Sequence, residues 1–359
     1  MSPSDPYARI EALTFDLCAI PSVTGDESAC AAWVEAVLRP TGLTLSRVGN
    51  TVLARGPVRG APLVLLVGHT DTVPPKGPIA ARREGTRIVG LGASDMKGGL
   101  AVMIALAERL NFTTLPYDVG FVFYDREEGP WADSGLGPTL EAEPWLTTAS
   151  LAFCLEPSDN DVQVGCLGTM HAKIAVPGRA SHSARPWQGE NAIHAAGPLL
   201  VALGALTPND IDCGGHRFRE VKSATLASGG RARNVIPDRF EVNVNFRFAP
   251  GRTLDDAEAE LRAFVAEHAP NAEVEISERA PSGRVVTDNA LLQRFLALNG
   301  NVVTAKQAWT DVARFSAAGV DAVNLGPGIS AQAHQAGEYA EVPLLHASYD
   351  QFHRFLTTP

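Results

Sequence analysis

The chain has 359 residues, of which 45% are apolar and 19% are charged, and its formal net charge is −10. This length exceeds the size at which a single hydrophobic core usually stops growing, so we expect two domains. The composition is typical of a soluble globular protein and excludes an intrinsically disordered chain. The acidic balance argues against general nucleic-acid binding, so we expect no nucleic-acid partner.

Membrane, secretory and disulfide-based classes are also excluded. The longest uninterrupted apolar run, around Leu63–Val67, is far shorter than the roughly 20 residues of a membrane-spanning helix. The segment Met1–Ile10 lacks the basic and then apolar pattern of a secretory signal, so we expect a cytoplasmic protein with no membrane partner. The cysteines form no C-x-x-C pair, which predicts buried thiols rather than a disulfide framework or a thiolate zinc site.

The first half of the chain predicts helices and buried strands. Apolar spacing indicates helices over Tyr7–Ile20 and after Asp26. Continuous apolar runs indicate strands that are buried on both faces of a mostly parallel sheet, and the segment 97–110 indicates a helix that packs on that sheet. The predicted strands are 61–68, 119–124 and 150–155.

The character of the sequence changes from about Gly168. Alternating strands and two helices then predict a separate α+β domain. Its strands are expected at 170–176, 221–228 and 240–248, and its helices at 190–206 and 254–267. After Pro281 the helix and strand pattern returns, with helices expected at 291–298, 312–317 and 345–355 and a strand at 320–325.

The simplest architecture is therefore an α/β domain made of both chain ends and interrupted by an inserted domain. We place the larger domain at 1–167 and 284–359 and the inserted domain at 168–283. The larger domain should contain the mostly parallel sheet flanked by helices.

Polar residues follow each predicted buried strand directly. His69 and Asp71 follow the first strand, Glu127 and Glu128 the second, and Glu156 the third. Open α/β sheets place their sites at these carboxyl ends. At this position an imidazole can bind a metal while a nearby carboxylate fixes its tautomer, although an isolated His-x-Asp is commonly a turn.

Two acidic motifs strengthen the prediction of a metal site. The adjacent carboxylates of Glu127 and Glu128 would repel each other unless a cation or a shared proton offsets them. Neighbouring side chains point apart, so one can bind a metal while the other faces a water molecule. Asp95 lies in the glycine-rich segment Gly90–Gly99, where the alternative interpretation is that Asp95 caps a helix. The spacing of the glycines matches neither common phosphate-binding motif, which argues against a nucleotide-dependent oxidoreductase.

A late histidine, His334, completes the candidate ligand set. Two histidines together with several carboxylates at the ends of a parallel sheet match the nitrogen and oxygen ligands of a hydrolytic zinc site. The number of carboxylates allows one of them to bridge two metal ions.

In these motifs the chain resembles the M20 family of metallopeptidases and deacylases over essentially its whole length. The motifs are Gly68-His-Thr-Asp71, Gly92-Ala-Ser-Asp95-Met-Lys-Gly-Gly99, Glu127-Glu128-Gly129, Glu156-Pro157, Gly178-Arg-Ala-Ser-His182-Ser-Ala-Arg-Pro, Asn234-Val-Ile-Pro237 and Gly326-Pro-Gly328.

The resemblance implies a role for each candidate residue. Two Zn²⁺ ions per subunit are expected, with Co²⁺ or Mn²⁺ as substitutes. His69 and Glu156 would bind one ion, Glu128 and His334 the other, and Asp95 would bridge them. Asp71 would orient His69, and Glu127 would act as the general base. The family often has a cis peptide after the bridging aspartate, so we expect one between Asp95 and Met96.

The resemblance also implies a ferredoxin-like fold for the inserted domain, which would act as a lid and form a homodimer. In related dimeric deacylases a histidine that corresponds to His182 reaches the partner subunit's active site and stabilises the oxyanion. His182 is therefore expected to be catalytic in the neighbouring subunit.

Substrate specificity depends on a second set of residues. Arg233, Asn234 and Arg247 can bind a carboxylate, while Thr310 and Gly326 correspond to cleft residues of the family. Several segments, among them 165–169 and 306–315, resemble actinobacterial succinyl-diaminopimelate desuccinylases. Those enzymes hydrolyse the succinyl amide of N-succinyl-LL-2,6-diaminopimelate in lysine and cell-wall biosynthesis.

Three alternatives stay open at this point. The same zinc chemistry would serve an N-acetylornithine or N-acetyl-lysine deacetylase, or a glutamate-releasing carboxypeptidase. Many desuccinylases have arginines where this chain has Gly165 and Cys166, which leaves carboxylate recognition there undetermined. A catalytically inactive metal-binding protein is the alternative from outside the enzymes.

Overall fold

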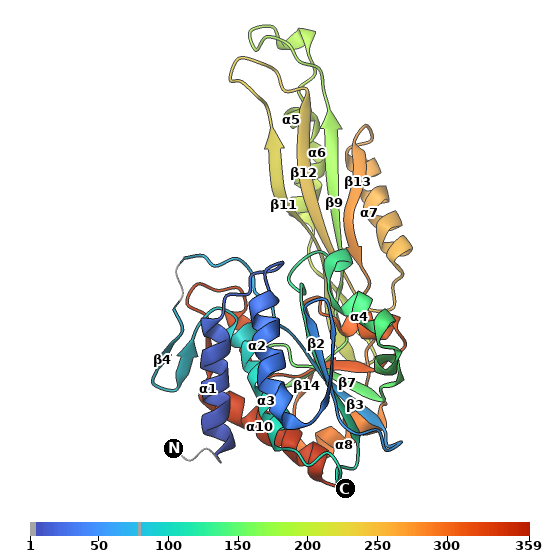
Figure 1. Cartoon of the computed structure of the whole chain (residues 1–359). Coiled ribbons are helices and arrows are strands. Elements are labelled where there is room, and N and C mark those ends of the chain that lie inside the picture. Colours follow the sequence, from blue (N-terminus) through green and yellow to red (C-terminus); the bar gives the residue numbers. More distant parts are fainter. Residues whose placement is uncertain (1–4, 78–79) are drawn as a thin grey trace. The chain divides into compact units, whose positions relative to one another are not determined.

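The computed structural model describes residues 5–77 and 80–359, and the chain forms two compact units (Figure 1). The larger unit comprises Met1–Gly165, Arg284–Lys306 and Thr310–Pro359, and the inserted unit comprises Cys166–Gly283 and Gln307–Trp309. No helix among the described residues is both long enough and apolar enough to cross a bilayer.

The larger unit contains a mixed sheet of eight strands in the order β1-β2-β6-β3-β7-β15-β8-β14. Its central strands β6, β3, β7 and β15 run parallel to one another. The strands are β1 (Thr44–Val48), β2 (Thr51–Arg55), β3 (Leu63–His69), β6 (Asp118–Tyr124), β7 (Leu151–Cys154), β8 (Val162–Val164), β14 (Val303–Ala305) and β15 (Ala322–Asn324).

Most strand pairings of this sheet are parallel, as expected, and the antiparallel pairings lie at its two sides. The hairpin of β1 and β2 joins the sheet antiparallel to β6, and β15 pairs antiparallel with β8. The hairpin and the two short strands β8 and β14 were not predicted, because β1 is largely exposed and the other three strands have apolar runs of at most three residues.

Helices cover both faces of the sheet. On one face α1, α2, α3, α8 and α10 enclose a core that includes Leu66, Phe121 and Phe153 (Figure 1). On the other face a Cβ added to Gly120 would meet Trp145 and Leu65. The helices are α1 (Pro6–Ala19), α2 (Ser28–Leu38), α3 (Gly98–Arg109), α4 (Leu136–Ala142), α8 (Ala290–Asn299), α9 (Val312–Ala317) and α10 (Val342–Thr357).

A small sheet of three strands lies in the same unit, in the order β16-β5-β4. The strands are β4 (Arg82–Glu84), β5 (Arg87–Val89) and β16 (Tyr339–Glu341). This sheet pairs a late segment of the chain with an early one, which brings the residues after His334 toward the turn that contains Asp95.

The inserted unit has an antiparallel sheet in the order β10-β11-β12-β9-β13. Without the edge strand β10, this order and the intervening helices form the β-α-β-β-α-β pattern of the expected ferredoxin-like fold. The strands are β9 (Gly168–Pro177), β10 (Asn209–Cys213), β11 (His216–Gly229), β12 (Arg239–Phe248) and β13 (Glu273–Ala280). The helices are α5 (Ala192–Ala195), α6 (Gly197–Ala205) and α7 (Leu254–His268).

The predicted helix 190–206 is divided in the structure. Asn191 caps α5 by accepting the N–H groups of Ile193 and His194, and the helix ends at Ala195. Pro198 has no N–H group to donate to the preceding turn, so a new helix begins at Gly197.

Candidate metal centre

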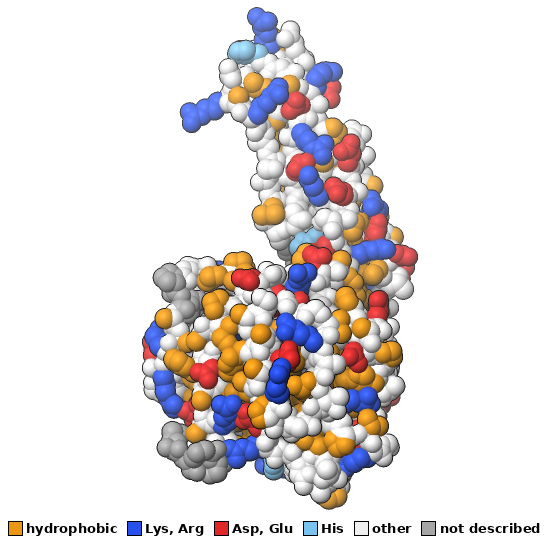
Figure 2. Space-filling view, in the orientation of Figure 1, with side chains coloured by type: hydrophobic (Ala, Val, Ile, Leu, Met, Phe, Trp, Pro, Cys, Tyr) orange, Lys and Arg blue, Asp and Glu red, His pale blue; other side chains and the backbone are white. Residues whose placement is uncertain are grey.

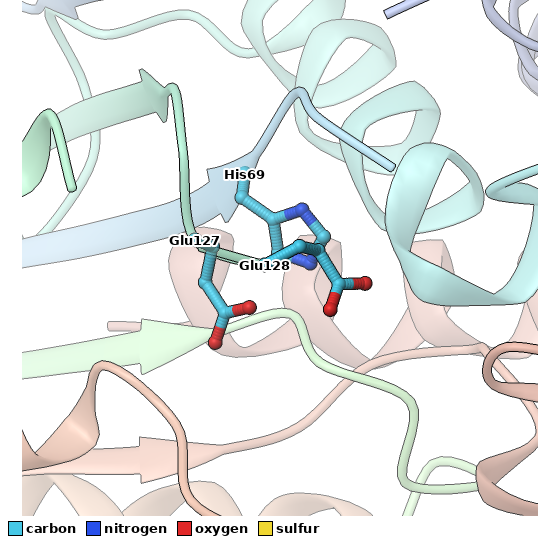
Figure 3. A group of neighbouring side chains, drawn as sticks. All are labelled: His69, Glu127 and Glu128. Carbon is cyan, nitrogen blue, oxygen red and sulfur yellow. The ribbon is translucent and has the colours of Figure 1, made fainter. Parts of the chain in front are cut away.

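The candidate ligands meet because they follow neighbouring parallel strands. His69 is the last residue of β3, and its register partner on β6 is Tyr124, just before Glu127 and Glu128. Glu156 follows β7, which pairs with the other side of β3. Figure 3 shows the side chains of His69, Glu127 and Glu128 at this edge of the sheet.

His69 is fully buried, and its two ring nitrogens have different neighbours. Nδ1 lies 3.0 Å from the backbone oxygen of Asp71, which fixes the ring as a donor at this atom. Nε2 lies 3.2 Å from Oδ1 of Asp95 and 3.9 Å from Oε1 of Glu156. The imidazole therefore presents Nε2 to two carboxylates.

The main hydrogen-bond partners of the Asp71 carboxylate are in the turn that contains Glu127 and Glu128. This carboxylate accepts the backbone N–H groups of Glu127 and Glu128, each at 3.0 Å, and the hydroxyl of Thr24 at 2.9 Å. Its Oδ1 is 3.4 Å from Nδ1 of His69, farther than the backbone oxygen. Asp71 thus links the imidazole to the turn after β6.

The two glutamates of this turn point in different directions (Figure 3), as expected for adjacent residues. Oε1 of Glu128 lies 2.9 Å from Nε2 of His334. His334 is half exposed and has a left-handed backbone, with φ of 61°. Its Nε2 is also 3.6 Å from Oδ2 of Asp95.

Asp95 therefore faces one histidine with each carboxylate oxygen. Two clusters with metal-ligand geometry share it: one with His69 and Glu156, and one with Glu128 and His334. Within each cluster the ligand atoms lie within 4.8 Å of one another. A third cluster joins His69, Glu127 and Glu128. The peptide bond between Asp95 and Met96 is cis, which confirms the prediction.

The electrostatics of this centre favour a bound cation. Burial and the neighbouring carboxylate of Glu156 raise the pKa of Glu127 well above its usual value. Burial, together with the carboxylate of Asp95, raises the pKa of Glu156 to about 7. Burial lowers the pKa of His69, but hydrogen bonds to Asp71 and Asp95 outweigh it and raise the pKa well above its usual value. Crowded carboxylates of this kind are stabilised by a positive charge.

Glu338 is a buried residue of this region for which no role was predicted. Its carboxylate accepts the backbone N–H groups of Gly92, Ser94 and Asp95 at 2.7–2.8 Å. Burial raises the pKa of Glu338 to about 7, although these N–H groups favour the ionised form. Its sequence position beside Gly337 is the only signal, and it does not distinguish Glu338 from a solvated acid.

The two candidate cleft residues of the larger unit are buried or tightly packed. Thr310 is 2% exposed. A Cβ added to Gly326 would lie 2.2 Å from the backbone oxygen of Leu155 and 2.6 Å from that of Glu156. The glycine is therefore required for the close approach of its chain to the segment that carries Glu156.

The remaining candidates belong to the inserted unit. His182, Arg233 and Asn234 are exposed on loops that hydrogen-bond to each other: the N–H of Ser183 donates to the carbonyl of Asn234 at 2.9 Å. Arg247, on β12, is partly buried, and its Nε donates to Asn245 at 3.0 Å. Burial lowers the pKa of Arg247.

Comparison with known proteins identifies the family to which this arrangement belongs. Residues 65–358 match the model of the peptidase family M20/M25/M40. A Mycobacterium tuberculosis protein provisionally named succinyl-diaminopimelate desuccinylase DapE is 38% identical over 346 residues, which cover 96% of this chain and 97% of the relative. The succinyl-diaminopimelate desuccinylase of Corynebacterium glutamicum is 34% identical, with 92% and 91% of the two chains covered.

Solved structures share the fold at lower identity. A tripeptidase from Staphylococcus aureus superposes with a TM-score of 0.81 at 20% identity, covering 98% of this chain and 97% of that one. The Bacillus subtilis protein YXEP, described as a dinuclear metal-binding peptidase of the M20 family, has a TM-score of 0.71 at 17% identity, with coverage of 98% and 97%. At these identities the likeness concerns the fold.

Proposed function

This chain belongs to the peptidase family M20/M25/M40, and from that membership we propose that it hydrolyses the succinyl amide of N-succinyl-LL-2,6-diaminopimelate to LL-diaminopimelate and succinate. The observation that carries the proposal is the pair of ligand clusters that share Asp95 beside the half-buried carboxylate of Glu127. Amide hydrolysis itself follows from the family and from the desuccinylases among its relatives.

The residues of the centre fit a pair of metal ions. Each cluster contains one imidazole nitrogen and carboxylate oxygens, which is the ligand chemistry of hydrolytic zinc sites. We assign His69 and Glu156 to one Zn²⁺ ion, Glu128 and His334 to the other, and Asp95 to both, with Co²⁺ or Mn²⁺ as substitutes. When bound, such a pair supplies Lewis-acid polarisation of the amide carbonyl and makes water more acidic.

Glu127 is the proposed general base. The carboxylate of Asp71 accepts the backbone N–H of Glu127, so the turn that positions the Glu127 side chain is fixed. Burial and Glu156 raise the pKa of Glu127, which suits a group that must take a proton from water and release it to the leaving amine. Asp71 also fixes the Nδ1 proton of His69 through its backbone oxygen, so that Nε2 keeps its lone pair for a metal.

His182 is proposed to act in the partner subunit of a homodimer. Its Nδ1 accepts the backbone N–H of Ala184 at 3.0 Å, which leaves Nε2 as the atom that can donate to a developing oxyanion. The side chain is exposed in the single chain, so a second surface can reach it.

Two features of the inserted unit support dimerisation through it. Residues 221–229 of β11 pair with β12, whereas β10 covers only residues 216–220 of the other edge. The rest of that edge has no strand partner among the described residues, and such edges readily pair with another chain. The neighbouring helix α6 exposes Val201 at 73%, a large apolar side chain of the kind that gathers at interfaces.

Carboxylate recognition is proposed for the arginines of the inserted unit. Arg233, Asn234 and Arg247 are the candidates for binding the acyl or amino-acid carboxylates. Thr310 and Gly326 stay candidate cleft residues on the family resemblance, behind the residues that face the site. Figure 2 shows Lys and Arg side chains interspersed with Asp and Glu on the visible face of the inserted unit, so recognition would depend on these individual residues rather than on a basic surface.

A substrate panel tests the proposal. Protein loaded with zinc is offered N-succinyl-LL-diaminopimelate, N-acetylornithine, N-acetyl-lysine and an acylated glutamate, and kcat/KM is measured for each. We expect the succinyl substrate to be preferred by at least about 100-fold, the order of discrimination that one paired carboxylate provides. Preference for an acetylated substrate would instead indicate a deacetylase, and release of glutamate would indicate a carboxypeptidase of the same family.

A further inference from the structure

A single hydroxyl group closes the loop that carries His334. Oγ of Ser94 accepts the backbone N–H of Ile329 at 3.1 Å and donates to the carbonyl of Tyr339 at 2.7 Å. Ser94 is fully buried. The hydroxyl therefore joins the beginning of the loop 329–339 to its end.

Glu338 makes the second connection between this loop and the turn of Asp95. One carboxylate oxygen accepts the N–H groups of Ser94 and Asp95, and the other accepts the N–H of Gly92. The backbone N–H of Gly90 in turn donates to the carbonyl of Glu338 at 3.0 Å. The same acidic residue thus holds the backbone of Asp95 and the chain that follows His334.

The rest of the loop has few other attachments. Ser330 bonds to Asp159 and to the carbonyl of Pro157 at the start of the loop. His334 is half exposed and is held through its side chain by Glu128. The pairing of β16 with β5 fixes the end of the loop, and Ser94 and Glu338 join that end to the turn of Asp95.

From this geometry we propose that Ser94 and Glu338 are positioning residues that set the distance between His334 and Asp95. The proposal builds on the metal pair of the proposed function. The two side chains differ in their hydrogen-bond partners. The hydroxyl of Ser94 bonds only to the loop, whereas the carboxylate of Glu338 also accepts the backbone N–H of Asp95, and Asp95 belongs to both metal clusters. Losing Ser94 should affect one metal site, and losing Glu338 should affect both.

Metal titration of the apo protein tests this difference. Zn²⁺ is titrated into wild type and variants by calorimetry with a competing chelator, and the binding step that disappears in His334→Ala identifies the site that contains His334. Ser94→Ala should weaken that step by about 10–100-fold, the usual effect of removing a residue that orients a ligand. The other step should stay within about threefold of wild type, because its remaining ligands follow strands β3 and β7.

Glu338→Gln is the complementary variant. Its amide group preserves the shape of the side chain but places an NH₂ donor against a backbone N–H, so at least one of the three bonds must be lost. We expect both binding steps to weaken.

The matched control is Ser348→Ala on α10. Ser348 is a fully buried serine whose hydroxyl has no hydrogen-bond partner among the described residues, so both binding steps should stay at the wild-type values. In the metal-free protein, amide exchange at Ile329 should accelerate by about tenfold in Ser94→Ala, as expected for one lost hydrogen bond, and not in Ser348→Ala.

Two results would overturn the proposal. One is a Ser94→Ala protein in which wild-type affinity persists at both sites; the other is equal weakening of both sites. If Glu338→Gln does not fold, Ser94→Ala and the Ile329 exchange rate decide alone. A wild-type chain that binds fewer than two ions would instead contradict the metal pair of the proposed function.

Discussion

The two units hold their candidate residues in opposite ways. In the larger unit His69, Asp71 and Glu156 are buried at strand ends and are fixed by backbone hydrogen bonds or by one another. In the inserted unit His182, Arg233 and Asn234 are exposed on loops. The first group is preorganised within one chain, whereas the second can act only after another surface or a substrate covers it.

This difference has an energetic cause. Several carboxylates buried beside one another are unfavourable unless a cation compensates them, so the larger unit stores electrostatic strain that a metal relieves. Exposed arginines and histidines are solvated and carry no such penalty. Substitutions in the larger unit should therefore change chemistry or stability directly, and those in the inserted unit should act mainly through assembly.

The largest expected effect is that of Glu127→Gln. Removing the general base while keeping the shape of the side chain should lower kcat by about 10²–10⁴-fold. Metal content should stay near two ions per chain, because the proposed ligands are unchanged. Turnover by stopped assay and metal content by mass spectrometry check this prediction; turnover at the wild-type level would mean that another group takes the proton.

His182→Ala should lower kcat by about 10²–10³-fold, the usual loss for one oxyanion donor. Because the proposed site is shared, a heterodimer of His182→Ala and Asp95→Ala subunits should recover part of the activity that both homodimers lack. Tagged subunits, co-purified and assayed for turnover, provide the measurement. Inactive heterodimers of demonstrated composition would place His182 outside the partner's site.

Arg314→Ala should destabilise the larger unit. The Arg314 guanidinium bonds to the fully buried carboxylate of Asp311 at 2.9 Å and stacks on the ring of Trp131, 3.6 Å from its centroid. Its removal leaves a buried charge, which costs about 3–5 kcal/mol of unfolding free energy. Denaturant unfolding measures the loss. The control is Arg239→Ala, whose exposed ion pairs in the inserted unit should contribute nothing measurable.

Val201→Asp should separate the subunits without unfolding them. The side chain is 73% exposed on α6, so a charge costs little in the single chain but is costly in an apolar interface. Sedimentation should show a monomer, and circular dichroism should show wild-type secondary structure. Turnover should fall in proportion to the dimer fraction. A variant that stays dimeric would move the interface away from α6.

Much of the site was predictable because the relevant contacts follow from strand order. Apolar runs identified β3, β6 and β7, and parallel pairing places the residues after them at one edge. The contacts of Glu338 with Gly92 and Asp95 were not predictable, because no sequence spacing relates two segments that tertiary folding brings together beside the small sheet of β5 and β16. The chief contact of Asp71, with the Glu127 and Glu128 amides, depends equally on tertiary geometry.

The smallest expected effect tests whether the two units are independent. Thr253 caps α7: its hydroxyl oxygen accepts the N–H of Asp256 at 3.1 Å. Thr253→Ala should cost about 1 kcal/mol, whereas Thr253→Ser keeps the cap and serves as the control. If the units unfold separately, amide exchange should accelerate in β9 and β12 but not in β3 and β6. Equal acceleration of amide exchange in the strands of both units would mean that the chain unfolds as one cooperative body. The loops of His182, Arg233 and Asn234 would then open with the same free energy as the metal centre.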